Sequence, residues 1–380
     1  MKKKIIAITL SVSMALSMAG CGGSGKESSV TAGPETAAKA ARENTDSVTA
    51  SSGNAELIAI ASEGLNTSIA CDPIELSLGC SGTVDGTVMG DAIYAAIEAA
   101  KSWTDGNFVV NFYPGGQLGG DVELIEGAQM GSVDMFTGAP TSQVGLIPEL
   151  AVLDIGGLYT DVDSANQVLS SFKDQLEPYY NKAGLHLATM YAPDFRILSS
   201  NKPITKAADL QGLNIRTQEN KYHMAFWKEL GTNPTPLAFG ELYIALQQGM
   251  LDAEENPWAS IVGAKLCEVQ KYIVETNHIP FVSTYVMNKS KYDGMSEEQK
   301  LACDQFVLFC ERYQLAGTAD DDARMSKLCQ TDYGIEVTPV TDEIRELYGK
   351  ASQVVIDMMK ENIDPAFVDS YVEAAKAAAK

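Results

Sequence analysis

The sequence predicts an α/β fold with two lobes, and two observations lead to that prediction. A unit of twelve residues occurs twice, at 123–134 and 241–252, and the copies share Glu, Leu, Gln, Gly and Asp in register without a gap. In each copy a helix ends at a glycine and leads into a strand, which is the compact connection of a parallel sheet. The chain also has 380 residues, enough for two domains. A chance match between two common crossovers is the alternative.

Each copy of the unit has further elements around it. Residues 107–113 are a strand candidate before the first copy, and residues 213–217 are one upstream of the second. In the second copy, three apolar residues at helical spacing precede Gly249, which stands where a left-handed cap would end the helix. Asn256 comes before a proline and is therefore pushed out of the helical region. Because ligands of open α/β sheets bind beyond the strand ends, we expect Asn256 to face a ligand.

The first 21 residues predict a lipoprotein signal peptide. A basic start at residues 2–4 precedes an apolar run from 5 to 19 that is too short for a stable membrane span. Small residues precede Cys21 as in a bacterial lipobox, although Met18 stands where leucine is usual. We expect Cys21 to be lipidated, and ordinary cleavage that leaves Cys21 unmodified is the alternative. Either outcome places the folded part outside the cytoplasmic membrane.

Residues 22–72 predict a flexible tether. Gly, Ser, Thr and Ala dominate this stretch, which has no sustained apolar period. A short apolar patch at 57–61 interrupts it, and the sequence does not decide whether that patch docks. We therefore expect the folded part to begin near Pro73.

Composition excludes several classes of partner and cofactor. The formal net charge of −22 argues against nucleic acid and against an anionic membrane surface as partners. The cysteines form no CxxC pair, and no cluster of Cys and His has the spacing of a zinc site. We expect His186, His223 and His278 to be structural, and we expect neither a metal nor a cofactor.

An extracytoplasmic location permits disulfides among the six cysteines that follow Cys21. Proximity in the sequence makes Cys71 with Cys80, or Cys303 with Cys310, the candidates. The second pair would lie about 10 Å apart along one helix, which disfavours a bond between them. The sequence leaves the pairing open.

Two arginines interrupt apolar segments in the second half of the chain. Alternation in residues 213–217 places Arg216 away from the face that carries Leu213 and Ile215. Arg196 likewise interrupts an extended apolar run. A planar guanidinium offers two parallel donors that match a carboxylate, so an arginine facing a cleft is a good receptor for an anion. A surface salt bridge is the alternative for either residue.

At this point the chain resembles a known family, the extracytoplasmic solute-binding proteins of TRAP (tripartite ATP-independent periplasmic) transporters. The resemblance covers roughly residues 74–348. It is specific because several motifs occur together and in order. These are YPGGQLG at 113–119, GSVD at 131–134, DLQGLNIR at 209–216, PTPLAFGELYIALQQG at 234–249, ENP at 255–257 and TNH at 276–278.

The resemblance implies a periplasmic-binding-protein-like fold that closes like a flytrap over a small organic anion, usually a carboxylate. It implies mixed sheets flanked by helices, and lobes joined by crossing strands and a long helix. Arg216 matches the residue that clamps the ligand carboxylate, and Arg196 matches a second basic position of the pocket. Asn256 matches an asparagine that binds the same carboxylate region, and Phe239 matches an aromatic wall. Tyr243 belongs either to the pocket or to the core.

Three further positions depart from what relatives carry. Cys80 and Ser81 occupy the first strand end, where an asparagine or histidine is common, so they give the pocket a different polar edge. Thr137 follows the first repeated unit in a small, weakly charged segment. We include all three among the expected ligand-binding residues, and the identity of the anion stays open.

The family's interlaced lobes imply that each lobe takes two parts of the chain. We assign 73–193 plus 281–315 to the first lobe and 194–280 plus 316–380 to the second. The crossings should lie near Pro193, near Pro280 and in the helix around residues 313–318. The tail at 320–380 should pack on the second lobe, because its apolar residues have helical spacing.

The predicted function is that of a receptor, with no enzyme activity. The protein would be a monomer that binds a small organic acid and delivers it to TRAP membrane permease subunits, held at the membrane by a lipid at Cys21. A receptor for a membrane sensor is one alternative. A secreted enzyme is another, with Asp194, Glu219 or Glu241 as its acid-base group, although the sequence has no nucleophile elbow, metal cluster or phosphate loop.

Overall fold

The computed structural model describes residues 54–378. The signal peptide at 1–21, the lipidation at Cys21 and the first part of the tether therefore lie outside the described residues. Within 54–378, no helix combines the length and the apolar character needed to cross a membrane.

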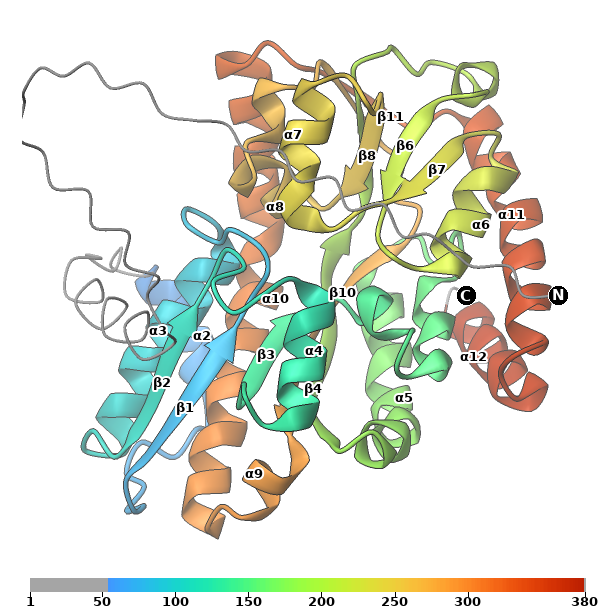
Figure 1. Ribbon diagram of the computed structural model, residues 1–380. Coiled ribbons are helices and arrows are strands. Elements are labelled where there is room, and N and C mark those ends of the chain that lie inside the picture. The colour runs from blue at the N-terminus through green and yellow to red at the C-terminus, as the bar shows by residue number, and fades with distance from the viewer. Residues whose placement is uncertain (1–53, 379–380) are drawn as a thin grey trace, which may run out of the picture. The chain divides into compact units, whose positions relative to one another are not determined.

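Two mixed sheets form the framework (Figure 1). The first has the order β2-β1-β3-β10-β4 and consists of β1 (Ile74–Gly79), β2 (Phe108–Tyr113), β3 (Met135–Gly138), β4 (Leu185–Phe195) and β10 (Pro280–Asn288). The second has the order β11-β9-β5-β8-β6-β7 and consists of β5 (Ile197–Ser200), β6 (Asn214–Thr217), β7 (Asn233–Pro236), β8 (Ala253–Asn256), β9 (Tyr272–Glu275) and β11 (Glu336–Pro339). We call each sheet with its helices a lobe.

Helices pack on both sheets. They are α2 (Ala55–Ser62), α3 (Val88–Trp103), α4 (Asp121–Met130), α5 (Val162–Lys182), α6 (Lys221–Glu229), α7 (Leu242–Gln247), α8 (Trp258–Gly263), α9 (Lys289–Asp293), α10 (Glu297–Asp332), α11 (Asp342–Lys360) and α12 (Pro365–Ala378). Short 3-10 helices are η1 (Pro140–Gln143), η2 (Pro148–Asp154), η3 (Ala207–Leu210), η4 (Phe239–Glu241) and η5 (Leu266–Glu268).

The repeated unit of the sequence is a repeated unit of structure. α4 leads into β3 and α7 leads into β8, and the strands lie in the equivalent orders β2-β1-β3 and β7-β6-β8. Both helices end before a glycine with positive φ, 79° at Gly131 and 69° at Gly249, as the sequence predicts.

The shared aspartate has the same role in both copies of the unit. Asp134 Oδ2 accepts a hydrogen bond from the Ser77 backbone in β1 at 2.8 Å. Asp252 Oδ2 accepts one from the Asn214 backbone in β6 at 3.1 Å. Each aspartate thus links the start of the last strand of its unit to the central strand.

The lobes are joined by crossing strands and a long helix, which confirms that part of the predicted fold. The chain leaves the first sheet at the end of β4 and enters the second at β5, and it returns between β9 and β10. The two crossings are hydrogen-bonded to each other, because the Arg196 backbone donates to Ile279 O at 2.9 Å. α10 contributes Phe306 to the core of the first lobe and Met325 to the core of the second.

The folded part begins earlier than the expected tether at 22–72 allows. α2 occupies part of the predicted tether and packs on α10. The Asn54 backbone donates to the Tyr313 hydroxyl at 3.1 Å, and Leu57 lies beside Gly317. The apolar patch that the sequence left unassigned therefore docks through Leu57, Ile58 and Ala61, which join the core of the first lobe, while Ile60 stays exposed.

The tail also differs from its expected place. α11 packs against α6 of the second lobe. α12, however, packs against α5, where the rings of Tyr371 and Phe172 meet edge to face at 5.0 Å. The reason is that the apolar face of α12 completes a core shared with α5 and η2 of the first lobe.

Gly317→Ala tests the docking of α2 on α10. An alanine Cβ there would lie 2.7 Å from Leu57 Cδ1 and 2.8 Å from Val88 Cγ2. Alanine in place of a helical glycine normally stabilises by roughly 0.5–1 kcal/mol, whereas overpacking costs about 1–3 kcal/mol. We expect Gly317→Ala to lower the free energy of unfolding measured by urea titration.

Gly349 is the matched control, because it is exposed in α11 and a Cβ there would meet nothing within 4 Å. Gly349→Ala should raise the free energy of unfolding by roughly 0.5–1 kcal/mol. If both substitutions stabilise equally, α2 does not pack where the structure places it.

Candidate functional site

A cleft of about 440 Å³ lies where residues of both lobes approach each other. The first lobe contributes Ser81, which follows β1, and Asp121, which begins α4. The second lobe contributes Arg216 from β6, Gln218 just beyond it and Phe239 from η4. Ligands of α/β sheets bind beyond the C-terminal ends of parallel strands, and β1 and β6 both end here.

Arg216 is the cationic residue that lines this cleft, and its side chain is held in one orientation. Its Nε donates to the Leu237 carbonyl oxygen at 2.8 Å, and its Cζ lies 5.8 Å from the centre of the Phe239 ring. Nη1 is buried and has no hydrogen-bond partner among the described residues. Burial lowers the pKa of Arg216, but from a value so high that the guanidinium stays charged near neutral pH.

Asp121 brings a carboxyl group to the first-lobe side of the cleft. Its Oδ1 accepts a hydrogen bond from the Ser81 hydroxyl at 2.5 Å. Burial raises the pKa of Asp121, while the bond from Ser81 and the charge of Arg216 counteract that rise. Arg216 is therefore close enough to Asp121 to interact with it electrostatically across the cleft.

Arg196 has a different environment, because a carboxylate of the protein already occupies its guanidinium. Nε donates to Glu255 Oε2 at 2.5 Å, and Nη2 donates to Glu255 Oε1 at 3.0 Å. Both side chains are almost fully buried, at 2% and 0% exposure. The charge of Arg196 is the main factor that holds the pKa of Glu255 well below its usual range against the effect of burial.

Asn256 is also engaged within the protein. Its Oδ1 accepts from Arg196 Nη2 at 3.0 Å, and its Nδ2 donates to Glu254 Oε2 at 2.6 Å. Burial raises the pKa of Glu254 to about 7, although hydrogen bonds from Ser199 and Asn256 favour its charged form. The structure thus brings Asn256 together with Arg196 rather than with Arg216.

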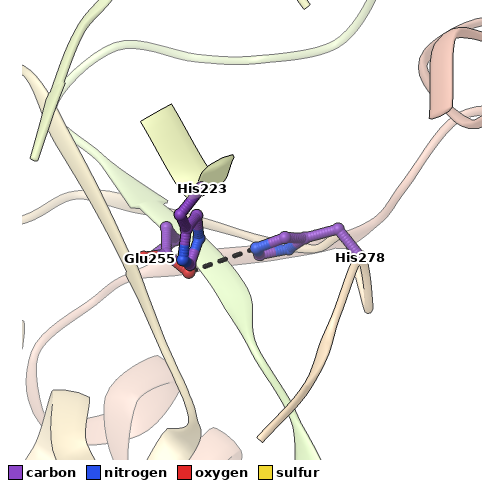
Figure 2. A group of neighbouring side chains, drawn as sticks. All are labelled: His223, Glu255 and His278. Atoms are coloured by element: carbon purple, nitrogen blue, oxygen red, sulfur yellow. Dashed lines mark hydrogen bonds and ion pairs between the residues drawn. The ribbon is translucent and has the colours of Figure 1, made fainter. Parts of the chain in front are cut away.

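Two histidines approach Glu255 from other elements (Figure 2). Nε2 of His278 lies 3.1 Å and Nε2 of His223 lies 3.3 Å from Glu255 Oε2. These three residues include the ligand types of a divalent-cation site. Both oxygens of Glu255 already accept from Arg196, whose positive charge would repel a cation, so the group does not fit a metal ion. We interpret it as a buried polar network in which His278 bonds to Glu255, while neither ring nitrogen of His223 has a hydrogen-bond partner among the described residues.

His278 is neutral in this network. Its Nδ1 lies 2.9 Å from the Thr276 hydroxyl and its Nε2 faces Glu255, so the tautomer with hydrogen on Nε2 satisfies both contacts. Phe226 and Trp227 pack against its ring. Burial lowers the pKa of His278 to about 4, although the bond to Glu255 counteracts this.

Five of the eight residues predicted to bind the ligand do not line the cleft: Arg196 and Asn256, described above, and Cys80, Thr137 and Tyr243. Cys80 is buried, and burial raises its pKa to about 12. Thr137 is buried within β3. The Tyr243 hydroxyl donates to Glu268 at 2.9 Å, and its ring packs on the second-lobe core. Ser81, Phe239 and Arg216 do line the cleft, and their role in binding a ligand stays a prediction.

Gln218 and Asp121 are among the residues of the cleft that sequence reasoning missed. Gln218 lies two positions after Arg216, and its buried Oε1 has no partner among the described residues. Asp121 begins α4. The position of Gln218 beyond a strand end could have indicated it, whereas the position of Asp121 depends on how α4 packs.

Acidification should remove the contribution that neutral His278 makes to the free energy of unfolding. The pKa of His278 falls from 6.5 to about 4 on folding, so between these values the unfolded state binds the proton more readily. Stability is therefore lost as pH falls through this window, by about 2 kcal/mol between pH 7 and pH 5. Glu254 has the opposite effect on the free energy of unfolding. Its pKa is raised to about 7, so it stabilises the folded state as pH falls and this stabilisation is lost as pH rises.

His278→Gln isolates the effect from that of Glu254. We expect the difference in free energy of unfolding between the protein and this variant, measured in urea at both pH values, to shrink by about 2 kcal/mol on acidification. A difference that does not change with pH would mean that His278 does not titrate in this way.

Comparison with known proteins agrees with this architecture. The profile of the bacterial extracellular solute-binding proteins, family 7 (DctP), matches residues 82–362. The 2,3-diketo-L-gulonate-binding periplasmic protein YiaO of Escherichia coli K12 is 30% identical over 250 residues, which cover 65% of this chain and 75% of that protein. The C4-dicarboxylate-binding periplasmic protein DctP of Rhodobacter capsulatus is 28% identical over 270 residues, covering 70% and 80%.

A solved structure has the same fold. The sugar acid binding protein DctPAm of Advenella mimigardefordensis, in complex with galactonate, superposes with a TM-score of 0.75 at 25% identity and covers 81% of this chain and 99% of its own. With the match over residues 82–362 and the two-sheet architecture, the chain belongs to family 7 of the bacterial extracellular solute-binding proteins, the DctP-like receptors of TRAP transporters.

Proposed function

We propose that this receptor binds a monocarboxylate that also carries hydroxyl groups, and that it delivers this ligand to the membrane subunits of a TRAP transporter. Proteins of the family are extracytoplasmic receptors for small organic acids and work with such permeases. The observation that carries the proposal is the buried, unpaired Nη1 of Arg216 in a cleft between the lobes. A ligand carboxylate would supply the missing partner.

Arg216 is suited to a carboxylate because its orientation is fixed before binding. The Leu237 carbonyl and the Phe239 ring hold the guanidinium, so little side-chain freedom is lost when the ligand arrives. Neither the carbonyl nor the ring carries a formal negative charge, so the positive charge of Arg216 is not neutralised by these contacts. A carboxylate placed there would receive charge-assisted hydrogen bonds, each worth roughly 1.5–3 kcal/mol.

The remaining groups of the cleft favour hydroxyls over a second carboxylate. Asp121, Glu123, Glu219 and Glu241 line it, and they would repel another negative charge. Carboxylates and the Gln218 amide can accept hydrogen bonds from hydroxyls. The relatives that bind 2,3-diketo-L-gulonate and galactonate support this ligand class, whereas the C4-dicarboxylate relative represents the competing one.

The other predicted site residues would support the cleft from behind its surface. Arg196 and Asn256 would position the second-lobe wall of the cleft through Glu255. Cys80 and Thr137 would support the first-lobe side from within its core. The receptor would act as a monomer without catalysing a reaction, held at the membrane by a lipid on Cys21.

Arg216→Ala should abolish most of the affinity for a sugar acid. With galactonate as the probe in isothermal titration calorimetry, we expect Kd to rise at least about 100-fold, because two charged hydrogen bonds are lost. The variant also loses the hydrogen bond from Nε to the Leu237 carbonyl oxygen, so its free energy of unfolding without ligand is measured beside Kd to show that the variant is folded. Tyr243→Phe is the control and should leave Kd within about twofold, because its hydroxyl binds Glu268. Equal affinity in Arg216→Ala would refute the proposed clamp.

Asp121→Asn tests the ligand class. An asparagine can still accept from Ser81 but no longer carries a negative charge near Arg216. We expect galactonate to bind the unaltered protein at least about tenfold more tightly than succinate. The variant should narrow that ratio by weakening galactonate and strengthening succinate. Tighter succinate binding in the unaltered protein would contradict the ligand class but leave the role of Arg216 intact.

A further inference from the structure

Two cysteines that lie far apart in the sequence meet inside the second lobe. Cys267 belongs to η5 and Cys329 to the last turn of α10, 62 positions further along the chain. Their Sγ atoms lie 2.7 Å apart, and both residues are buried, at 4% and 0% exposure. This pairing differs from the two that proximity in the sequence suggests.

The candidates from the sequence have other neighbours. Cys303 Sγ contacts the sulfur of Met287 at 3.3 Å, and Cys310 Sγ faces the Ala92 carbonyl oxygen at 3.9 Å. Both lie in the core of the first lobe. Residues seven positions apart on one helix lie about 10 Å apart, which is too far for a disulfide. The two sulfur atoms accordingly contact other groups.

The surroundings of Cys267 and Cys329 are apolar. Ile273, Met325 and Ile335 belong to the same core cluster. In the described part of the chain, the cluster of metal-ligating side-chain types lies elsewhere, at His223, Glu255 and His278, and Cys267 and Cys329 do not belong to it. Contact with Cys329 and burial both raise the pKa of Cys267, so the reduced residue is a thiol and a poor metal ligand.

We propose that Cys267 and Cys329 are joined by a disulfide in the exported protein. The family is extracytoplasmic, and disulfides persist outside the cytoplasm. Two S–H bonds break, one S–S bond forms, and two protons and two electrons leave. A disulfide-bearing oxidant accepts them by thiol–disulfide exchange and is itself reduced to two thiols.

The bond would close a segment that makes an excursion through the first lobe. From Cys267 the chain passes through β9, crosses to β10 and α9, and returns along α10 to Cys329. Both ends of this excursion would be fixed in the second lobe. Because η5 follows α8, which begins just after Asn256 and Pro257, the bond would also tie the segment behind the cleft to α10.

Peptide mapping of the unaltered full chain tests the bond directly. Trypsin separates the two cysteines into the peptides 266–271 and 328–345, each with one cysteine. After export, or after exposure of the unfolded chain to oxidised glutathione during refolding, we expect these peptides to be linked until a reductant is added. Peptides with Cys71, Cys80, Cys303 and Cys310 should be alkylated without reduction. Alkylation of Cys267 and Cys329 before reduction would overturn the proposal.

Thermal unfolding gives a second measurement. Reduction should lower the Tm of the oxidised protein by about 5–10 °C, because a loop of this length constrains the unfolded chain. The double variant Cys267→Ser/Cys329→Ser should have the lower Tm and should not respond to reductant. Cys71→Ser, a buried cysteine outside the pair, should keep the response. A Tm of the unaltered protein that is equal with and without reductant would also overturn the proposal.

Discussion

The buried ion pair between Arg196 and Glu255 is the contact on which the rest of the site depends. Arg196 lies where the chain crosses from the first sheet to the second, and Glu255 lies in β8 of the second sheet. Each residue would be costly without the other, since breaking a buried pair costs about 3–5 kcal/mol. The pair therefore fixes the crossing against β8. It also orients Asn256, which accepts from Arg196, and His278, which bonds to Glu255.

Arg216 differs from Arg196 in what surrounds it rather than in its burial. Both are 2% exposed, yet Arg216 contacts a carbonyl group and an aromatic ring instead of a carboxylate. Its charge is thus available to a ligand. An anion bound to Arg216 and to the side of the cleft that carries Ser81 and Asp121 would link the lobes and shift their population toward the closed form. The crossings and α10 are the connections about which such a movement would occur.

The sequence predicts the features that depend on local patterns. The glycine caps, the repeated helix and strand unit, and Arg216 at a strand end all follow from spacing of a few residues. The features that it missed depend on distant parts of the chain. Glu255 lies 59 positions from Arg196, and Glu268, which accepts from the Tyr243 hydroxyl, lies 25 positions from Tyr243. The docking of α2 on α10 and of α12 on α5 likewise depends on surfaces that only the folded chain brings together.

A crystal structure with a bound sugar acid, such as galactonate, would test the central claim most directly. We expect the ligand carboxylate to lie about 2.7–2.9 Å from the guanidinium nitrogens of Arg216. The hydroxyl groups should face Asp121, and the pair between Arg196 and Glu255 should remain as it is here. A carboxylate bound to Arg196, with Glu255 displaced from it, would contradict the account.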